Sequence, residues 1–164
     1  MTKKFYCVDD FRVGAQQRMP RVIFDYVDGA AGFETSSRLN RDMIDQIRLM
    51  PRVLVDIRER ELAKTFLGRT WRLPFGIAPM GMCNLAWPNT DKAFAAAAVD
   101  HDIPVCLSTF GSSSIEDMGE RASGNGWFQL YVGPSVDDAM DLVQRAKNTG
   151  YEYLVLTVEV PVAS

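Results

Sequence analysis

Short apolar stretches alternate with longer amphipathic stretches through the second half of the chain. The apolar stretches "LPFGIAPM", "IPVCLST", "GWFQLYV" and "YLVLTVEV" begin at Leu73, Ile103, Gly126 and Tyr153. Between them lie "TDKAFAAAAVDHD", "SSIEDMGERA" and "SVDDAMDLVQRAKNTG", whose composition and periodicity indicate helices. Almost wholly apolar strands separated by helices are typical of a parallel α/β sheet. The pattern therefore predicts four βα units from Leu73 onward.

The first 72 residues follow a different pattern, which predicts a helical extension. Residues 8–27 indicate helix, and Pro20 can open a second short helix. A glycine-rich turn then precedes an amphipathic helix with four apolar residues on one face: Leu39, Met43, Ile44 and Ile47. Residues 65–67 stand just before Gly68 and predict a small β-hairpin.

Polar or small residues stand at the carboxyl end of each predicted strand. These ends read Ala78-Pro79-Met80-Gly81, Leu107-Ser108-Thr109, Gln129-Leu130-Tyr131 and Thr157-Val158-Glu159. In parallel α/β folds, ligand sites gather at this end of the strands. No glycine-rich phosphate loop precedes a helix here, which weakens a nucleotide-binding doubly wound fold. Hydroxyl and amide groups suit a flat ring system with a polar edge, such as a flavin. The residues alone leave open a small open α/β domain or half of a (β/α)8 barrel.

Composition and charge narrow the class of partner. The 164 residues include 18 basic and 21 acidic side chains, a net charge of −3, so we expect no nucleic-acid partner. Cys7, Cys83 and Cys106 are far apart, which predicts reduced, buried thiols and no metal site. The sequence has no secretory signal and no apolar run long enough to span a bilayer. We therefore expect a cytoplasmic protein.

Six stretches, in this order, carry a family resemblance: "FDYVDGAAGFETSSRLNRD", "PRVLVDI", "LPFGIAPMG", "IPVCLSTFGSSSIEDM", "WFQLYV" and "LVLTVEVPV". The chain resembles the N-terminal half of the FMN-dependent α-hydroxy acid dehydrogenases and oxidases, a family that acts on lactate, mandelate and glycolate. The resemblance implies one α/β domain, a (β/α)8 TIM barrel. Residues 1–72 would form its helical extension and hairpin, and residues 73–164 its strands one to four.

The resemblance also implies a cofactor, a reaction and partners. FMN would take electrons from a lactate- or mandelate-like L-2-hydroxy acid, giving the 2-oxo acid. Quinone or oxygen would be the electron acceptor, and the full-length protein would be a homo-oligomer. The implied flavin contacts are the backbone of one segment and three side chains: Pro79, Met80 and Gly81, then Ser108, Gln129 and Thr157.

Four further residues take substrate-binding or catalytic roles by the same resemblance. The phenols of Tyr26 and Tyr131 would face the α-hydroxy acid, and Phe110 would line its pocket. Glu159 would pair with the imidazole of the catalytic base, so the implied catalytic residues are Tyr131 and Glu159.

The chain departs from the family pattern at several of these positions. Met80 stands where threonine is frequent, and Phe110 where glycolate oxidase has tryptophan, which makes glycolate a less secure substrate. Gly81 replaces the alanine of many oxidases, which favours a dehydrogenase. Glu159 replaces aspartate and reaches farther by one methylene. Since a shift of ~1 Å in a preorganised site can cost a hundredfold in rate, this change predicts reduced activity unless the pocket compensates.

The catalytic base of the family has no counterpart in this sequence. The sole histidine, His101, ends the alanine-rich helix, on the face of a barrel opposite the site. A half-barrel would also leave two strand edges unpaired. We therefore expect a truncated product or partial sequence, with a dimerising half-barrel as the less favoured explanation. By itself it would neither retain FMN tightly nor turn over substrate.

Two other classes stay open at this point. One is a non-catalytic half-barrel, a pseudoenzyme or interaction module that keeps the fold alone. The other is a different barrel enzyme, such as an FMN-dependent isomerase or an aldolase, although no predicted strand ends in the lysine that an aldolase needs. Peripheral attachment to the inner membrane is also left open.

Overall fold

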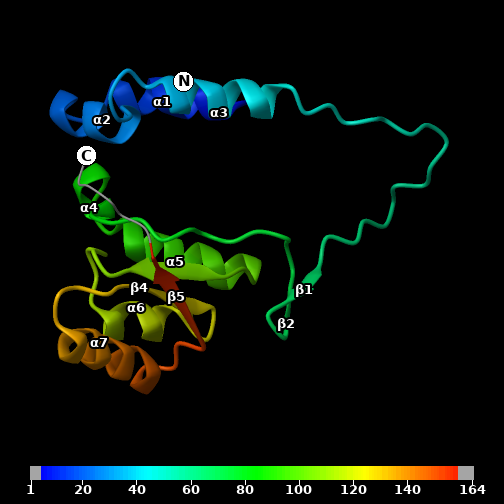
Figure 1. Cartoon of the computed structure of the whole chain (residues 1–164). Coiled ribbons are helices and arrows are strands. Elements are labelled where there is room, and N and C mark those ends of the chain that lie inside the picture. The colour runs from blue at the N-terminus through cyan, green and yellow to red at the C-terminus, as the bar shows by residue number, and fades with distance from the viewer. Residues whose placement is uncertain (1–4, 159–164) are drawn as a thin grey trace. The chain divides into compact units, whose positions relative to one another are not determined.

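The computed structural model describes residues 5–158, and Figure 1 labels most of its helices and strands. The chain divides into two compact units, one running to Glu59 and the other starting at Arg60. This division groups the hairpin with the sheet. The boundary at residue 72 between extension and barrel strands stays a prediction.

The described part of the first unit, from residue 5, contains three helices, α1 (Val8–Gln16), α2 (Arg21–Asp28) and α3 (Thr35–Asp45). Pro20 occupies the N-cap position of α2, so this helix opens where the sequence predicts. Within the unit, Arg12 Nη2 donates to Asp28 Oδ2 at 2.7 Å, which joins α1 to α2. The apolar side chains of α3 and of the turn after it are exposed: Leu39, Met43, Ile44 and Ile47.

The predicted hairpin is confirmed. It consists of β1 (Lys64–Phe66) and β2 (Arg69–Trp71), paired antiparallel around Gly68, which has a positive φ of 80°. The Trp71 side chain is fully buried, and its ring lies 6.3 Å from that of Trp127. Arg69 donates to the Gly124 carbonyl at 2.7 Å, just before the strand that carries Trp127. The hairpin therefore covers the amino-terminal end of the sheet.

Three parallel strands form the sheet, in the order β3 (Val105–Ser108), β4 (Gly126–Tyr131) and β5 (Tyr153–Thr157). The predicted helices are α5 (Thr90–His101), α6 (Ile115–Ala122) and α7 (Val136–Asn148), and a short α4 (Cys83–Ala86) was not predicted. Ser114 caps α6, because its Oγ accepts from the Asp117 amide at 3.1 Å.

The first predicted strand, over residues 73–80, is reduced to a single parallel bridge between Ile77 and Val105. Ile77 N donates to the Pro104 carbonyl at 2.8 Å, and Cys106 N donates to the Ile77 carbonyl at 3.0 Å. Pro74 and Pro79 lack the N–H groups that further ladder bonds would need. Apolar composition correctly predicts that this segment lies beside β3, but its prolines limit the pairing to one residue.

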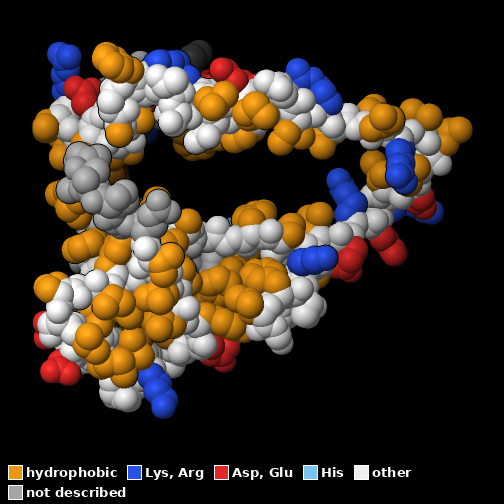
Figure 2. Space-filling view, in the orientation of Figure 1, with side chains coloured by type: hydrophobic (Ala, Val, Ile, Leu, Met, Phe, Trp, Pro, Cys, Tyr) orange, Lys and Arg blue, Asp and Glu red, His pale blue; other side chains and the backbone are white. Residues whose placement is uncertain are grey.

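The hydrophobic core lies between one face of the sheet and the helices. Its strand residues are Val105, Leu107, Phe128 and Leu130, and its helix residues include Ala95, Met118, Ala122 and Ala146. Figure 2 shows hydrophobic side chains gathered over the region of β5, α6 and α7, and Leu154, Leu156 and Met140 in these elements are exposed. Among the described residues, no helix is long and apolar enough to cross a membrane.

The cysteines are not all buried. Cys83 and Cys106 lie in the interior, but Cys7 is exposed at the start of α1, so its predicted burial is wrong. The difference arises because Cys7 occupies the helix N-cap position, which faces solvent.

Candidate active site

The second face of the sheet carries the predicted flavin contacts. Register places Ser108 opposite Gln129, and Tyr131 opposite Thr157. Since side chains alternate along a strand, these residues all point away from the face that packs on the helices. Cys106, Trp127 and Tyr153 share this second face nearer the hairpin, and Val155 lies in register with Gln129. The polar groups thus occupy the carboxyl end of one sheet face.

Three predicted side chains form a continuous hydrogen-bonded chain across the strands. Ser108 Oγ donates to Gln129 Oε1 at 3.0 Å, and Gln129 Nε2 donates to Thr157 Oγ1 at 2.8 Å. Ser108 and Gln129 are buried, with 6% and 2% exposure. The Thr109 backbone amide also donates to Gln129 Oε1 at 3.2 Å, and because an N–H can only donate, that end of the amide is the oxygen.

The backbone segment at Gly81 lies against the loop that follows β3. Met82 N donates to the Phe110 carbonyl at 2.9 Å. A Cβ at Gly81 would lie 3.1 Å from Phe110 Cβ, so glycine permits this close approach. Cys83 Sγ donates to the Met80 carbonyl at 3.4 Å. The predicted cofactor segment and the predicted substrate-facing residue are therefore in contact.

Phe110 and Tyr131 form an aromatic pair at the same end of the sheet. Their ring centroids lie 5.3 Å apart with an interplanar angle of 41°. Phe110 is 61% exposed, and Tyr131 is half-buried. The Tyr131 phenol has no hydrogen-bond partner within residues 5–158. It is therefore free to bind a polar group of a ligand.

Two residues without a predicted role hold this end of the site together. Thr109 Oγ1 donates to the Gln129 carbonyl at 2.6 Å and accepts from Tyr131 N at 3.0 Å. Asp91, which is 4% exposed, accepts from the amides of Ser112 and Ser113, each at 2.8 Å. A hydroxyl at a predicted strand end pointed to Thr109. No pattern in the sequence distinguished Asp91, which looks like an ordinary acid in the first turn of a helix.

The remaining predicted residues lie elsewhere. Tyr26 is on α2 in the first unit and is 64% exposed, so its role toward the substrate stays a prediction. Glu159 lies outside the described residues. His101 is exposed at the carboxyl end of α5, and the chain then enters β3 at the end opposite Ser108.

An apolar cavity of about 440 Å³ lies beside the segment that carries Pro79. Cys106, Trp127 and Val155 from the second face of the sheet line it, together with Phe66 of the hairpin. Burial raises the pKa of the Cys106 thiol to about 12, so this thiol stays neutral. The cavity therefore continues the site inward as an uncharged, apolar space.

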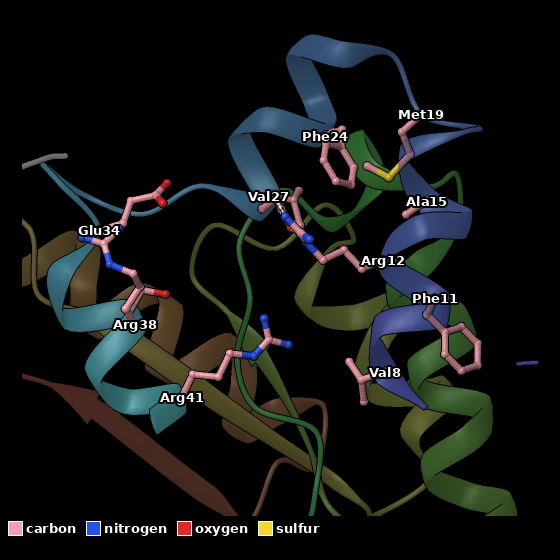
Figure 3. A pocket seen from close by; sticks show the side chains of 12 residues that line it. Val8, Phe11, Arg12, Ala15, Met19, Phe24, Val27, Glu34, Arg38 and Arg41 are labelled. Carbon is pink, nitrogen blue, oxygen red and sulfur yellow. Dashed lines mark hydrogen bonds and ion pairs between the residues drawn. The ribbon is translucent and has the colours of Figure 1, made fainter. Parts of the chain in front are cut away.

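A second cavity, of about 550 Å³, lies within the first unit among α1, α2 and α3. Figure 3 shows its apolar wall from α1 and α2 and the side chains of Arg12 and Arg41 that reach into it. Arg12 pairs with Asp28, and Arg41 Nη2 donates to Asp9 at 2.7 Å. None of the predicted site residues lines this cavity.

The sequence model of the FMN-dependent dehydrogenases matches residues 15–164. The chain belongs to the FMN-dependent dehydrogenase family. It is 40% identical over 162 residues to (S)-mandelate dehydrogenase of Pseudomonas putida, covering 99% of this chain and 41% of that protein. It is 35% identical to 2-hydroxyacid oxidase 2 of Bos taurus, covering 94% of this chain and 44% of that one. The chain thus spans less than half the length of these relatives.

Solved structures of the family show the same fold. A soluble mutant of the membrane-associated (S)-mandelate dehydrogenase from Pseudomonas putida has a TM-score of 0.91 at 40% identity, covering 97% of this chain and 45% of that one. Mandelate oxidase has a TM-score of 0.88 at 32% identity, covering 96% and 46%. The architecture is therefore part of a (β/α)8 barrel, which decides between the two folds that the strand pattern left open.

FMN is the cofactor of this family, as the resemblance implied. The donors at the strand ends fit a flavin ring. After its bond to Thr157, the Gln129 amide nitrogen keeps one N–H, and the Thr157 hydroxyl keeps its proton. Within residues 5–158, neither proton has an acceptor. A ring edge with carbonyl and nitrogen acceptors would satisfy both donors.

Proposed function

We propose that this chain serves the FMN-dependent oxidation of a lactate- or mandelate-like L-2-hydroxy acid to the 2-oxo acid. The observation that carries this proposal is the row of hydrogen bonds from Ser108 through Gln129 to Thr157, beside the free phenol of Tyr131. The relatives named (S)-mandelate dehydrogenase, 2-hydroxyacid oxidase and L-lactate dehydrogenase support the substrate class.

The proposed roles separate cofactor from substrate. Gln129 and Thr157 would donate to the flavin ring, and the backbone of Pro79, Met80 and Gly81 would run beside it. When bound, FMN supplies an acceptor for the two electrons that leave the substrate. The Tyr131 phenol would donate to the substrate's carboxylate or to its α-oxygen, and we propose the same for Tyr26.

Phe110 would form the wall beside the substrate's side chain. Its ring is exposed and tilted against Tyr131, which offers an apolar surface next to the polar phenol. An aryl or methyl group can pack there, whereas glycolate has no such group. This favours lactate- or mandelate-like acids over glycolate.

We propose that the proton-abstracting base is not among these 164 residues. His101 is their only histidine, and it is exposed at the far end of the strands. Glu159 would orient and stabilise the imidazole of that base. We therefore expect the 164-residue chain alone to bind FMN weakly and to leave substrate unchanged.

Gly81 favours a dehydrogenase that uses a quinone or similar acceptor over one that uses oxygen. For the full-length protein we propose a homo-oligomer, as the family resemblance implied.

Attachment to a membrane would be peripheral. The structure of a relative, (S)-mandelate dehydrogenase, is that of a monotopic membrane protein, which supports an attachment that does not cross the membrane. Sedimentation of the full-length protein with inner-membrane vesicles, before and after a high-salt wash, tests the attachment.

Equilibrium dialysis with FMN tests the site. We expect weak, saturable binding by the unsubstituted chain and about tenfold weaker binding by Gln129→Leu, since a buried hydrogen-bonding group is worth about 1–3 kcal/mol. Gln144→Leu is the matched control, because Gln144 donates only to Asn148 on α7. Equal binding by the two variants, or no saturable binding at all, contradicts the flavin site.

Substrate addition tests the remaining roles. Anaerobic L-lactate or (S)-mandelate should perturb the visible spectrum of the bound flavin without bleaching it. Tyr131→Phe should weaken that perturbation, because it removes the phenol alone. Bleaching by the unsubstituted chain would show that a base lies within these residues and would contradict the proposed division of roles.

A further inference from the structure

The side chain of Thr109 occupies the point where the pairing of β3 and β4 ends. The ladder stops at Ser108 and Gln129. One residue further on, Thr109 Oγ1 donates to the Gln129 carbonyl at 2.6 Å and accepts from Tyr131 N at 3.0 Å. A single hydroxyl therefore replaces the backbone rung that would otherwise join the two strands here.

Thr109 also contacts the side chain of Gln129. Its backbone N donates to Gln129 Oε1 at 3.2 Å, alongside the bond from Ser108 Oγ. Because two donors meet the amide oxygen, the amide nitrogen must point toward Thr157. Thr109 thus fixes both the backbone and the amide orientation of the residue proposed to donate to the flavin.

The bond to Tyr131 N fixes the second partner. Tyr131 ends β4, so its amide would have no acceptor on β3 without the Thr109 hydroxyl. The backbone at Tyr131 sets where its phenol stands relative to Gln129. One hydroxyl therefore couples the proposed cofactor contact to the proposed substrate contact.

We infer that Thr109 is a positioning residue, whose hydroxyl holds Gln129 and Tyr131 in register for flavin and substrate. This inference rests on the proposed function, but its geometry is independent of it. Helix capping does not account for the hydroxyl, since α6 is capped by Ser114. Both of its partners are residues of the site.

Four substitutions test the inference. Thr109→Val keeps the shape and removes the hydroxyl, Thr109→Ala removes it without adding a methyl group, and Thr109→Ser retains it. Thr149→Val is the control, because Thr149 Oγ1 donates to the Arg145 carbonyl at the end of α7, away from the site. Thermal melting of each variant shows which ones fold, and Thr109→Ala replaces Thr109→Val if the latter does not.

The first readout is hydrogen exchange of the Tyr131 amide, together with the NMR resonances of the Gln129 side-chain amide. We expect Thr109→Val to exchange about five- to tenfold faster at Tyr131, since the lost hydrogen bond is worth about 1 kcal/mol. The Gln129 side-chain resonances should move. Thr109→Ser should restore both, and Thr149→Val should change neither.

The second readout is FMN affinity by equilibrium dialysis. Thr109→Val should weaken it about fivefold, and Thr109→Ser should restore it. Unchanged Tyr131 exchange and Gln129 resonances in Thr109→Val overturn the inference, as does failure of Thr109→Ser to restore them. Faster exchange with unaltered FMN affinity also overturns it, because the role is then structural alone. If no variant binds FMN, the proposed function fails, and the Gln129 resonances still decide the orientation that Thr109 imposes.

Discussion

At the scale of single residues, the second face of the sheet changes character along its length. Near the hairpin it is apolar, with Cys106 and Trp127 lining a cavity. At the carboxyl ends of the strands it is polar, with Gln129 hydrogen-bonded to Ser108 on β3 and to Thr157 on β5. Burying a polar side chain costs free energy unless its hydrogen bonds are made. The choice and orientation of side chains are therefore more restricted at the polar end of this face than at its apolar end.

The Cys106 thiol predicts a loss of stability at alkaline pH. Its pKa is raised by burial to about 12 from an ordinary value of 9.0. Between these values the unfolded chain releases a proton that the folded chain keeps, so the free energy of unfolding falls as pH rises. Burial also raises the pKa of Tyr151, which adds to the fall. Urea unfolding at increasing pH measures the slope.

Cysteine variants separate the contribution of this thiol. Cys106→Ala should flatten the slope above pH 9.0, and the exposed-site variant Cys7→Ala serves as the matched control for losing a thiol. An equal slope for Cys106→Ala and the unsubstituted chain would show that the thiol does not contribute.

The limits of sequence reasoning at this scale are illustrated by Thr109 and Gln129. Strand alternation and the parallel pattern suffice to bring Ser108, Gln129 and Thr157 to one end of one face. They do not show that Thr109 bonds to two residues on the next strand, because that depends on where the ladder stops. Asp91 escapes prediction for a similar reason, since its partners lie 21 and 22 residues away.

At the scale of elements, the loop between β3 and α6 is held by contacts from α4 and α5. Asn84 N donates to Ser112 Oγ at 3.1 Å, and Asp91 accepts from the amides of Ser112 and Ser113. This loop carries Phe110, so the helices that precede β3 position the proposed substrate wall. A carboxylate that accepts two amide protons is a strong anchor.

Removing this anchor should loosen the loop. Asp91→Ala leaves two amides without their acceptor, which should lower the free energy of unfolding by about 1–3 kcal/mol. Hydrogen exchange at Ser112 and Ser113 should quicken. Asp100→Ala, at an exposed position on the same helix, is the control and should change neither quantity. Protected amides in Asp91→Ala would contradict the anchoring role.

Another prediction concerns the bridge between residues 73–80 and β3. A Cβ at Gly76 would lie 2.5 Å from Pro104 Cγ and 2.7 Å from the Pro104 carbonyl oxygen, so Gly76→Ala should force the segment away. We expect a loss of about 1–3 kcal/mol in the free energy of unfolding and faster exchange of the Ile77 amide. At Gly133 nothing lies within 4 Å of an added Cβ, so Gly133→Ala should cost less than about 0.5 kcal/mol. Similar losses in the two variants would refute close packing at Gly76.

The same segment shows how far composition predicts an element. Its apolar residues predict a strand at the right place, and Ile77 does pair with Val105. Pairing ends within one residue because Pro74 and Pro79 cannot donate to a ladder. The hairpin and the three later strands do form, and β3 begins at Val105, just after Pro104.

At the scale of the whole molecule, the pattern of strands and helices predicts a parallel sheet but does not distinguish a barrel from an open sheet. The family resemblance makes that distinction, and the fold of the relatives supports it. The boundary between the two units lies after Glu59, within the irregular segment between α3 and β1, whereas the sequence places its boundary at residue 72.

That segment should be the first site of proteolysis. Within the described part of the chain, residues 47–63 form no helix or strand, and Arg52, Arg58 and Arg60 are exposed there. Arg58 pairs with Asp56, but an exposed pair contributes little to stability. Trypsin should therefore cut after these arginines and leave a fragment that contains the sheet. Arg121 and Arg145 lie in packed helices, so the rate of cleavage after them should be at least about tenfold lower.

Mass spectrometry of timed digests identifies the order of cuts. A chain with Arg52, Arg58 and Arg60 all changed to Gln should persist longer, while Arg38→Gln, which alters a residue within α3, should leave the first cuts unchanged. Early cleavage within residues 105–157 would contradict a compact second unit. If the sheet and its helices lost their packing after the first cuts, Arg121 and Arg145 would become exposed and would be cut next. Early cleavage confined to residues 47–63 would therefore show that the second unit keeps its packing without the first.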